Sequence, residues 1–122
     1  MKKPFKIVFD EEKSIEVEKG YVVDNYLSKT DDMGYSIVRT HLHGKHPFMK
    51  NINSNRTYYL LSGNATFVFL DHVVAIQKGE MLVIPKNTKY AFKGNFDAIL
   101  VDSPAFDAKD DIIFDEELED TK

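Results

Sequence analysis

Short apolar runs, each ended by residues that favour turns, recur along the whole chain. They are rich in β-branched and aromatic residues and are separated by Gly, Asn, Asp and Pro, for example at Lys78-Gly79. The runs recur every 8–12 residues or so, and no long window keeps the apolar spacing of a helix before the C-terminal tail. This pattern predicts an all-β protein, a sandwich or barrel, with strands at 6–9, 14–17, 21–27, 35–43, 57–62, 65–70, 72–77, 80–85, 89–93 and 96–104.

Two segments break this pattern. The stretch Gly44–Asn55, GKHPFMKNINSN, has little strand character and ends in turn-prone residues, which predicts a loop at a barrel mouth, where binding residues often collect. The tail after Phe106 carries the apolar triplet Ile112–Phe114 between acidic residues and could form an edge strand, a short helix or an irregular segment. We therefore divide the chain into N-terminal strands at 1–34 that could form a dimer edge, a barrel core at 35–106 and an acidic tail at 107–122.

Charge and composition exclude several classes of protein. At 122 residues the chain is expected to form one domain, and its net charge of −4 is concentrated in the tail, where eight acidic and two basic residues carry −6. The rest of the chain is close to +2 and has no basic stripe, so we expect no nucleic-acid partner. The chain contains no Cys, which rules out disulfides, thiolate metal sites and a Cys nucleophile.

The apolar runs are also too short for a membrane protein. None approaches the ~20 residues needed to span a bilayer, so we expect no membrane partner. The two N-terminal lysines are followed by Asp10-Glu11-Glu12 instead of the long apolar stretch of a signal peptide. We therefore expect a cytoplasmic location.

Between Gly63 and Gly94 the sequence resembles the cupin superfamily of small jelly-roll β-barrels. The segment TYYLLSGNATFVF is similar to the cupin strand–turn–strand in which a Tyr-rich strand ends at a Gly. The segment KGEMLVIPKNTKYAFKG is similar to the second cupin motif, with five residues between Gly79 and Pro85. The likeness extends over residues 35–106 and implies a single-domain cupin (jelly-roll) β-barrel. Because cupins of this size commonly pair through edge strands, it also implies a homodimer.

The positions that bind metal in cupins are changed in this chain. The resemblance implies two His and a Glu from the first motif and one His from the second. Arg56 stands at the Glu position, and the two His positions of the first motif fall near Met49 or Lys50 and near Asn51 or Ile52. Tyr90 stands at the His position of the second motif. We therefore expect a barrel that uses neither a metal nor another cofactor.

His41 and His43 offer a different route to a metal site. Residues two apart on a strand point to the same face, so their imidazoles are expected to lie about 6–7 Å apart. A Pro-Phe dipeptide stands where the Glu would have to follow them, and two ligands without a third make a poor site. A metal-dependent cupin built on these histidines is thus the least favoured alternative. The alternation does not settle which face is inward, and His46, in the predicted loop, is a weaker candidate.

Six residues are candidates for ligand binding, each with a structural alternative. Arg56 would clamp a carboxylate or phosphate, or form an internal ion pair, because a buried unpaired guanidinium is very costly. Tyr58 and Tyr90 would hydrogen-bond a ligand or pack in the core with satisfied hydroxyls. Asn51 would bind ligand or cap the loop. The substrate-binding candidates are thus Arg56, Tyr58, Tyr90, Asn51, His41 and His43, and the catalytic candidates are His41, His43 and Tyr90.

Two functions are consistent with these residues. The first is a metal-independent cupin that binds a small polar or anionic molecule, such as a carboxylate, a phosphate or a sugar derivative. The second resembles the cupin enzymes that epimerise or isomerise nucleotide-linked sugars with His and Tyr as base and acid. Such an enzyme requires a carboxylate that orients the base, and the barrel strands offer Asp97 and Asp102. The sequence favours the binding protein and leaves open whether the chain is an enzyme.

Overall fold

The structure, a computed structural model, describes residues 3–119 of the chain. In this range the order of elements is η1 (Glu11–Lys13), β1 (Ser14–Glu18), β2 (Tyr21–Leu27), η2 (Lys29–Asp31), β3 (Ser36–Asn51), β4 (Asn55–Val68), β5 (Val73–Gln77), β6 (Met81–Ile84), β7 (Tyr90–Ser103), η3 (Ala108–Asp110) and β8 (Asp111–Ile113), where η marks a short 3-10 helix. The all-β class predicted from the sequence is confirmed. Within the same range, no helix has the length and apolar character needed to cross a membrane.

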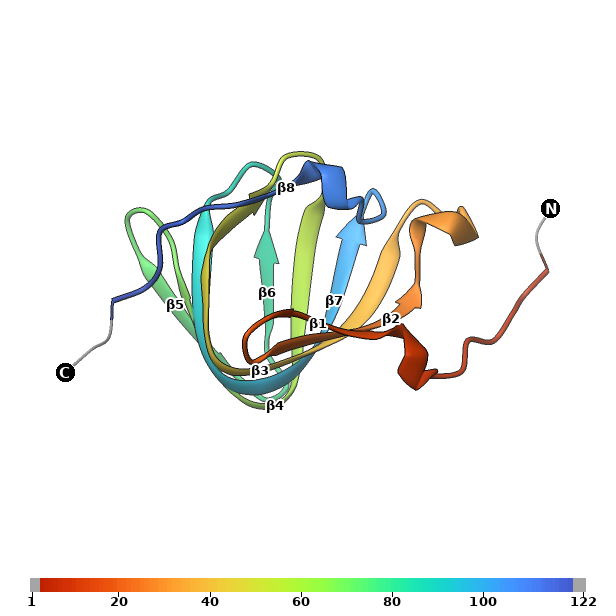
Figure 1. The fold of residues 1–122 in the computed structure, drawn as a ribbon, viewed down its shortest axis with the longest axis horizontal. Coiled ribbons are helices and arrows are strands. Elements are labelled where there is room, and N and C mark those ends of the chain that lie inside the picture. Colours follow the sequence, from red (N-terminus) through yellow and green to blue (C-terminus); the bar gives the residue numbers. More distant parts are fainter. Residues whose placement is uncertain (1–2, 120–122) are drawn as a thin grey trace.

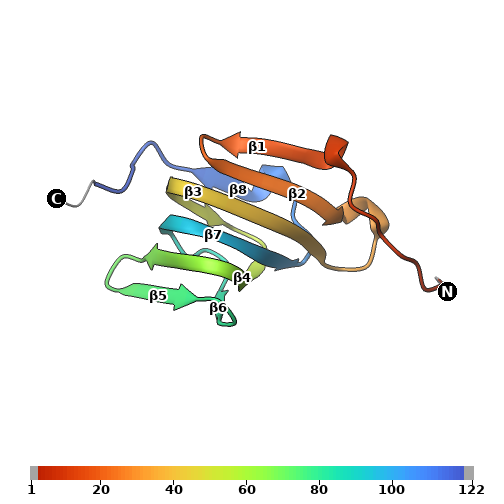
Figure 2. The same cartoon turned by 90° about the horizontal axis from the view of Figure 1, so that it is seen from below.

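The strands form one antiparallel sheet that curls into a barrel (Figure 1). Figure 2 shows β1, β2, β3, β7, β4 and β5 side by side in that order. The long strands β3 and β4 both pair with β7 over most of their length. Shorter strands pair with opposite parts of the long ones, β2 and β8 with β3, and β5 and β6 with β4. The two ends of each long strand thus pair with different short strands, and the long strand bends around the core between them.

Two glycines make these bends possible. The sequence pattern ends strands at Gly63-Asn64 and at Gly94-Asn95, but β4 and β7 continue through both pairs, so these two turn predictions are wrong. Gly63 and Gly94 have φ values of +81° and +141°, and a Cβ on either would collide with the backbone of the opposite strand. Glycine therefore lets the two strands bend and cross closely, and a register shift in β4 just before Gly63 adds to the bend.

Two other element predictions are also wrong. Most of the segment Gly44–Asn55 is not a loop, because β3 continues to Asn51 and pairs there with β7 and β8, which leaves only residues 52–54 between β3 and β4. Residues Lys6–Phe9 form no strand; they belong to an irregular N-terminal arm, and the Phe9 ring stacks on Tyr26 with centroids 5.9 Å apart. The C-terminal half of β3 is extended because β7 and β8 pair with it, and residues 6–9 are irregular although their sequence favours a strand. In both places strand pairing determines the conformation more than local propensity does.

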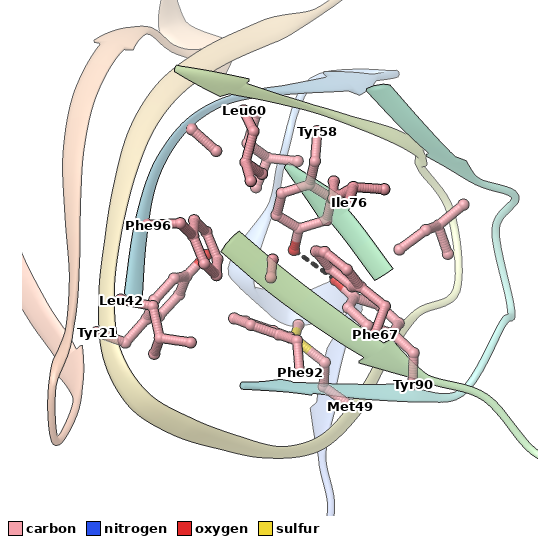
Figure 3. Close-up of a cluster of buried hydrophobic side chains, with 14 residues drawn as sticks. Tyr21, Leu42, Met49, Tyr58, Leu60, Phe67, Ile76, Tyr90, Phe92 and Phe96 are labelled. Carbon is pink, nitrogen blue, oxygen red and sulfur yellow. Dashed lines mark hydrogen bonds between the residues drawn. The ribbon is translucent and has the colours of Figure 1, made fainter. Parts of the chain in front are cut away.

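The core lies inside the barrel and is largely aromatic (Figure 3). Alternation along the strands directs every second side chain inward, as the period-two pattern predicts. Phe67 and Phe92, from neighbouring strands, stack with ring centroids 5.4 Å apart. Full burial of a side chain of this kind stabilises the fold by about 1.5–3 kcal/mol. The core side chains labelled in Figure 3 are Tyr21, Leu42, Met49, Tyr58, Leu60, Phe67, Ile76, Tyr90, Phe92 and Phe96.

Candidate functional site

A cavity of about 380 Å³ lies between the barrel and its two terminal segments. The β1–β2 hairpin forms one wall, β3 and β7 another, and the segment after β7 a third. The walls are mainly apolar, and the carboxylates of Asp102 and Asp111 both accept hydrogen bonds from Arg56; we call these three residues the charged floor. The lining residues are Ile15, Val17, Glu18, Tyr21, Val23, Asn25, Ser36, Val38, His46, Met49, Arg56, Leu100, Asp102, Phe106, Ala108, Asp111 and Ile113.

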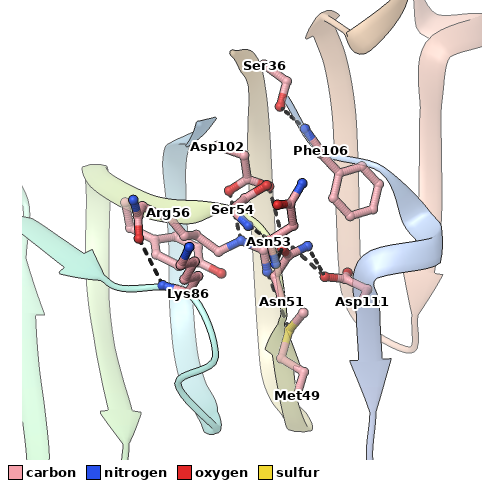
Figure 4. Close-up of polar contacts among 12 residues, drawn as sticks. Ser36, Met49, Asn51, Asn53, Ser54, Arg56, Lys86, Asp102, Phe106 and Asp111 are labelled. Carbon is pink, nitrogen blue, oxygen red and sulfur yellow. Dashed lines mark hydrogen bonds and ion pairs between the residues drawn. The ribbon is translucent and has the colours of Figure 1, made fainter. Parts of the chain in front are cut away.

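Arg56 is the centre of the charged floor (Figure 4). Its side chain is 4% exposed and points inward from β4. Nε and Nη2 donate to the two carboxylate oxygens of Asp102 at 2.8 and 2.9 Å, which makes a bidentate ion pair between adjacent strands. Nη2 also donates to Asp111 at 3.3 Å. Nη1 donates to the Tyr90 hydroxyl at 3.1 Å and to the Met49 sulfur at 4.0 Å.

These contacts occupy the guanidinium completely. An arginine has five N–H donors, and each of them has a partner here. Burial by itself would lower the pKa of Arg56, but the Tyr90 and Tyr58 hydroxyls and the Asp102 carboxylate outweigh burial and raise this pKa, so the side chain stays charged. The structure therefore shows the internal ion pair that was the structural alternative for Arg56. A bound carboxylate or phosphate would have to displace one of the present partners.

Tyr58 and Tyr90 lie next to Arg56 in the core and do not line the cavity. They are 0% and 1% exposed, and their hydroxyls are hydrogen-bonded to each other at 2.8 Å. Burial raises the pKa of both phenols, so both remain neutral at physiological pH. Tyr90 contacts the guanidinium directly and Tyr58 contacts Tyr90. Together they position Arg56 from the core side.

Asn51 connects the loop between β3 and β4 to the C-terminal segment. Its Oδ1 accepts the backbone N–H groups of Asn53 and Ser54 at 2.9 and 2.6 Å, so it caps the loop. Its Nδ2 donates to Asp111 at 2.9 Å and holds that carboxylate on the charged floor (Figure 4). Sequence reasoning did not select Asp111, because it is one of many acids in the tail and nothing local distinguishes it.

His46 lines the cavity, although the sequence pattern placed it in a loop and made it a weaker candidate than His41 and His43. It is 2% exposed and stacks on Phe92 with ring centroids 4.6 Å apart. Its Nδ1 lies 2.7 Å from the carbonyl oxygen of Pro47, and because a carbonyl only accepts, Nδ1 carries the proton. Burial lowers the pKa of His46, so the ring is neutral and Nε2 is its basic nitrogen. Continuing the period-two pattern from Leu42 would have placed His46 on the inward face.

His41 and His43 share one face of β3, as predicted, but it is the outer face of the barrel. The neighbours Thr40 and Leu42 are the inward residues, and neither histidine lines the cavity. His41 lies between two carboxylates, with Nε2 2.7 Å from Asp24 and Nδ1 2.5 Å from Asp97. Burial would lower the pKa of His41, but the hydrogen bonds to these carboxylates outweigh burial and raise this pKa.

Asp97 and Asp102, the two candidates for an orienting carboxylate, thus lie on opposite sides of the barrel wall. Asp97 is bonded to His41 on the outside, and Asp102 is bonded to Arg56 on the inside. Within residues 3–119, no group of three or more His, Asp or Glu side chains is arranged to hold a metal ion. The ionisable side chains that line the cavity therefore include His46, Glu18 and the charged floor.

Comparisons by sequence find no relative: no protein-family model and no curated protein matches the chain. Solved structures do match. Pac13, a unique nucleoside dehydratase, superposes with a TM-score of 0.80 at 22% identity over 94% of this chain and 95% of its own. Variants of Streptomyces PAC13 in structures with uridine match as well; two carry a Tyr-to-Phe change and one a His-to-Gln change.

Two further solved structures have a similar fold. Ectoine synthase from P. lautus matches with a TM-score of 0.72 at 16% identity over 91% of this chain and 87% of its own. A cupin-2 domain containing protein from Shewanella frigidimarina matches with a TM-score of 0.56 at 18% identity over 58% of this chain and 72% of its own. The predicted cupin-type jelly-roll β-barrel is confirmed by these likenesses, which concern the fold.

Proposed function

We propose that this cupin-fold chain binds an uncharged, ring-containing small molecule of the nucleoside class in its cavity, and that it does so without a metal ion. The observation that carries the proposal is the cavity itself. Its volume of about 380 Å³ is within the range of small-molecule sites, and its apolar walls surround a few convergent polar groups. A ring can pack on the walls while the charged floor and His46 hydrogen-bond its polar edge.

The likeness to Pac13 supports the nucleoside class. That protein is a nucleoside dehydratase, its variants have been solved with uridine, and nearly the whole of this chain superposes on it. Metal independence is supported by the residues at the positions that resemble cupin ligand positions, because Arg56 and Tyr90 stand there and are bonded to each other. A guanidinium repels a metal cation.

A second candidate function is an enzyme that removes a proton from such a ligand with His46. The observation that favours it is the fixed tautomer: the Pro47 carbonyl holds the proton on Nδ1 and leaves Nε2 basic. This differs from the nucleotide-sugar epimerase or isomerase considered from the sequence, whose base was to be His41 or His43, because both of these lie outside the barrel. The binding protein and the enzyme share one cavity.

Calorimetric titration with uridine tests the proposal. We expect uridine to bind the full chain with a dissociation constant of about 1 mM or tighter. Val23 and Val22 are adjacent on β2, and only Val23 lines the cavity. Val23→Phe should fill the cavity and weaken binding at least about tenfold, whereas Val22→Phe should leave binding unchanged. No binding of uridine, or equal binding by both variants, would overturn the proposal.

Mass spectrometry separates the enzyme from the binding protein. The chain and His46→Gln are incubated with uridine and related nucleosides, and the nucleosides are then examined for a change of mass. Conversion by the chain but not by His46→Gln would support the enzyme. Binding without conversion would support the binding protein.

A homodimer is also part of the proposal. On the outer surface of the barrel, the apolar side chains of Ile37, Tyr59, Met81, Val83, Ile99 and Val101 lie on four neighbouring strands, β3, β7, β4 and β6; we call this set the outer apolar face. Met81 and Val83 are 65% and 62% exposed. A second copy of the chain, packed on this face, would remove it from water.

A further inference from the structure

The charges around the cavity determine which ligands it can accept. Four of the lining side chains are formally charged: the guanidinium of Arg56 and the carboxylates of Glu18, Asp102 and Asp111. His46 adds no charge at neutral pH, because burial lowers its pKa. The lining therefore carries one positive and three negative formal charges, a net charge of −2.

The single cation of the lining is not available to an anion. Both carboxylate oxygens of Asp102 are bonded to Arg56, Asp111 approaches the same guanidinium, and the remaining N–H groups face Tyr90 and Met49. An incoming phosphate would have to break a buried bidentate pair and leave Asp102 without its partner. Breaking a buried pair in this way is strongly unfavourable.

The carboxylates, in contrast, have acceptor positions left. The hydrogen bonds that Asp111 makes within residues 3–119 use its Oδ1, and its side chain is 18% exposed. Glu18 lines the cavity from β1 and makes no side-chain hydrogen bond within the same range. Charged acceptors of this kind favour ligands that present N–H and O–H groups.

The walls make this preference stronger. Val23, Val38, Leu100 and Phe106 are apolar and line the space between these charges. An anion that enters such a space loses hydration and gains no cation in return, which is costly. An uncharged ring loses little hydration and gains apolar contact.

We infer that the cavity selects unphosphorylated nucleosides and rejects the corresponding nucleotides, with the donor groups of the ligand directed to Asp111 and Glu18. This rests on the proposed function, since it specifies the charge of a ligand that the same cavity holds. It also narrows the polar or anionic ligand expected from the sequence to one that is uncharged or cationic.

Competition between uridine and uridine 5′-monophosphate tests the inference. Both are titrated into the full chain by calorimetry at low ionic strength, where charge repulsion is least screened. We expect the monophosphate to bind more than about tenfold more weakly than uridine, because like charges brought together inside a site repel each other strongly. Inorganic phosphate, used as a third probe, should show no binding.

Two matched variants test whether the cavity charges cause the difference in affinity between uridine and its monophosphate. Glu18 and Glu16 both lie on β1, but only Glu18 lines the cavity. Glu18→Gln keeps the shape of the side chain and removes one negative charge, so the discrimination between the two ligands should shrink severalfold. Glu16→Gln should leave it unchanged.

The possible outcomes separate the two proposals. If the monophosphate binds as tightly as uridine or more tightly, the charge selection is wrong and the nucleoside-binding function stands. If the discrimination is present but equal in Glu18→Gln and Glu16→Gln, the lining charges do not cause it and the inference is overturned. If neither ligand binds, the proposed function fails and the inference fails with it.

Discussion

A guanidinium is tolerated inside a protein where its charge is balanced and its N–H groups all have acceptors, and Arg56 meets both conditions. Its partner Asp102 is equally buried, with 3% of its side chain exposed. Each charge therefore depends on the other. Arg39 provides a contrast, because it pairs with Asp97 at 3.3 Å while 39% of its side chain remains exposed to water.

We predict that Arg56→Met lowers the free energy of unfolding by about 3–5 kcal/mol, because Asp102 is left as an unpaired buried charge. Arg39→Met, the matched control on the outer surface, should lower it by less than about 1 kcal/mol. The double variant Arg56→Met/Asp102→Leu should recover a large part of the loss, since both charges are removed. Urea denaturation at neutral pH measures all three. Similar losses for Arg56→Met and Arg39→Met would contradict the buried pair.

Among the site residues, those whose role depends on one strand were predicted best. The resemblance of its position to a cupin ligand position, together with alternation along β4, suggested an inward Arg56, and the cost of an unpaired charge suggested an ion pair. Asp111 could not be predicted, because it reaches Arg56 only through the pairing of β8 with β3. His46 was within reach of the same alternation but was assigned to a loop.

At the scale of elements, His41 joins three strands. It projects from β3 and is bonded to Asp24 of β2 and Asp97 of β7, while Asp24 also accepts a hydrogen bond from Ser14 of β1. Arg39 also belongs to this cluster, because its guanidinium donates a hydrogen bond to Asp97. The cluster therefore connects the β1–β2 hairpin, which forms one cavity wall, to the barrel.

This connection makes part of the stability depend on pH. The pKa of His41 is raised above its ordinary value of 6.5, because the bonds to Asp24 and Asp97 outweigh burial. A histidine with a raised pKa in the folded state contributes stability that is fully present below its unfolded pKa and is lost as the pH rises through the folded pKa. The stabilisation from His41 is therefore greatest in mild acid.

We predict that His41→Gln lowers the free energy of unfolding by about 1 kcal/mol or less below about pH 6, and by a smaller amount in mild alkali. His43→Gln, on the same face of β3 and exposed, is the matched control variant. Thermal or urea unfolding over a pH series measures both variants. A loss for His41→Gln that grows as the pH rises would have the wrong sign and would exclude the proposed cluster.

Element boundaries show the limit of local sequence patterns. Gly63-Asn64 and Gly94-Asn95 have the composition of turns, but the strands that contain them have partners on both sides of each glycine. A pairing partner supplies the hydrogen bonds that keep a bent segment extended, and the sequence does not show which strands are neighbours. The same reason explains why β3 extends beyond Gly44.

For the molecule as a whole, the barrel fold could be predicted from the sequence, whereas the set of residues that line the cavity could not. The barrel follows from spacing, turn residues and the resemblance to cupins in residues 35–106, all of which are continuous in the sequence. The cavity is assembled from the β1–β2 hairpin, β3, β4, β7 and the C-terminal segment, so its lining exists only after the sheet has formed. The net charge of this lining, on which the proposed charge of the ligand rests, depends on the same assembly of elements.

The outer apolar face is a property of the whole sheet. Tyr59 is paired with Met81 on one side and Ile99 on the other, and Val101 is paired with Ile37. The residues that alternate with them, such as Tyr58 and Leu100, are in the core, so these parts of the strands are largely apolar on both sides. An antiparallel sheet with one face in water normally alternates between apolar and polar residues. The proposed second copy of the chain, packed on this face, would account for the departure.

We predict that the chain is a homodimer in solution and that the outer apolar face is its interface. Met81→Lys/Val83→Lys places two charges on this face and should convert the dimer to a monomer in light scattering after size-exclusion chromatography. Val73→Lys is the control, because Val73 is 59% exposed on β5 and lies outside this face. A dimer that survives the double substitution would exclude the outer apolar face and direct attention to the free edge of β1, where the sequence first suggested pairing. A chain that is monomeric at every concentration would exclude both interfaces.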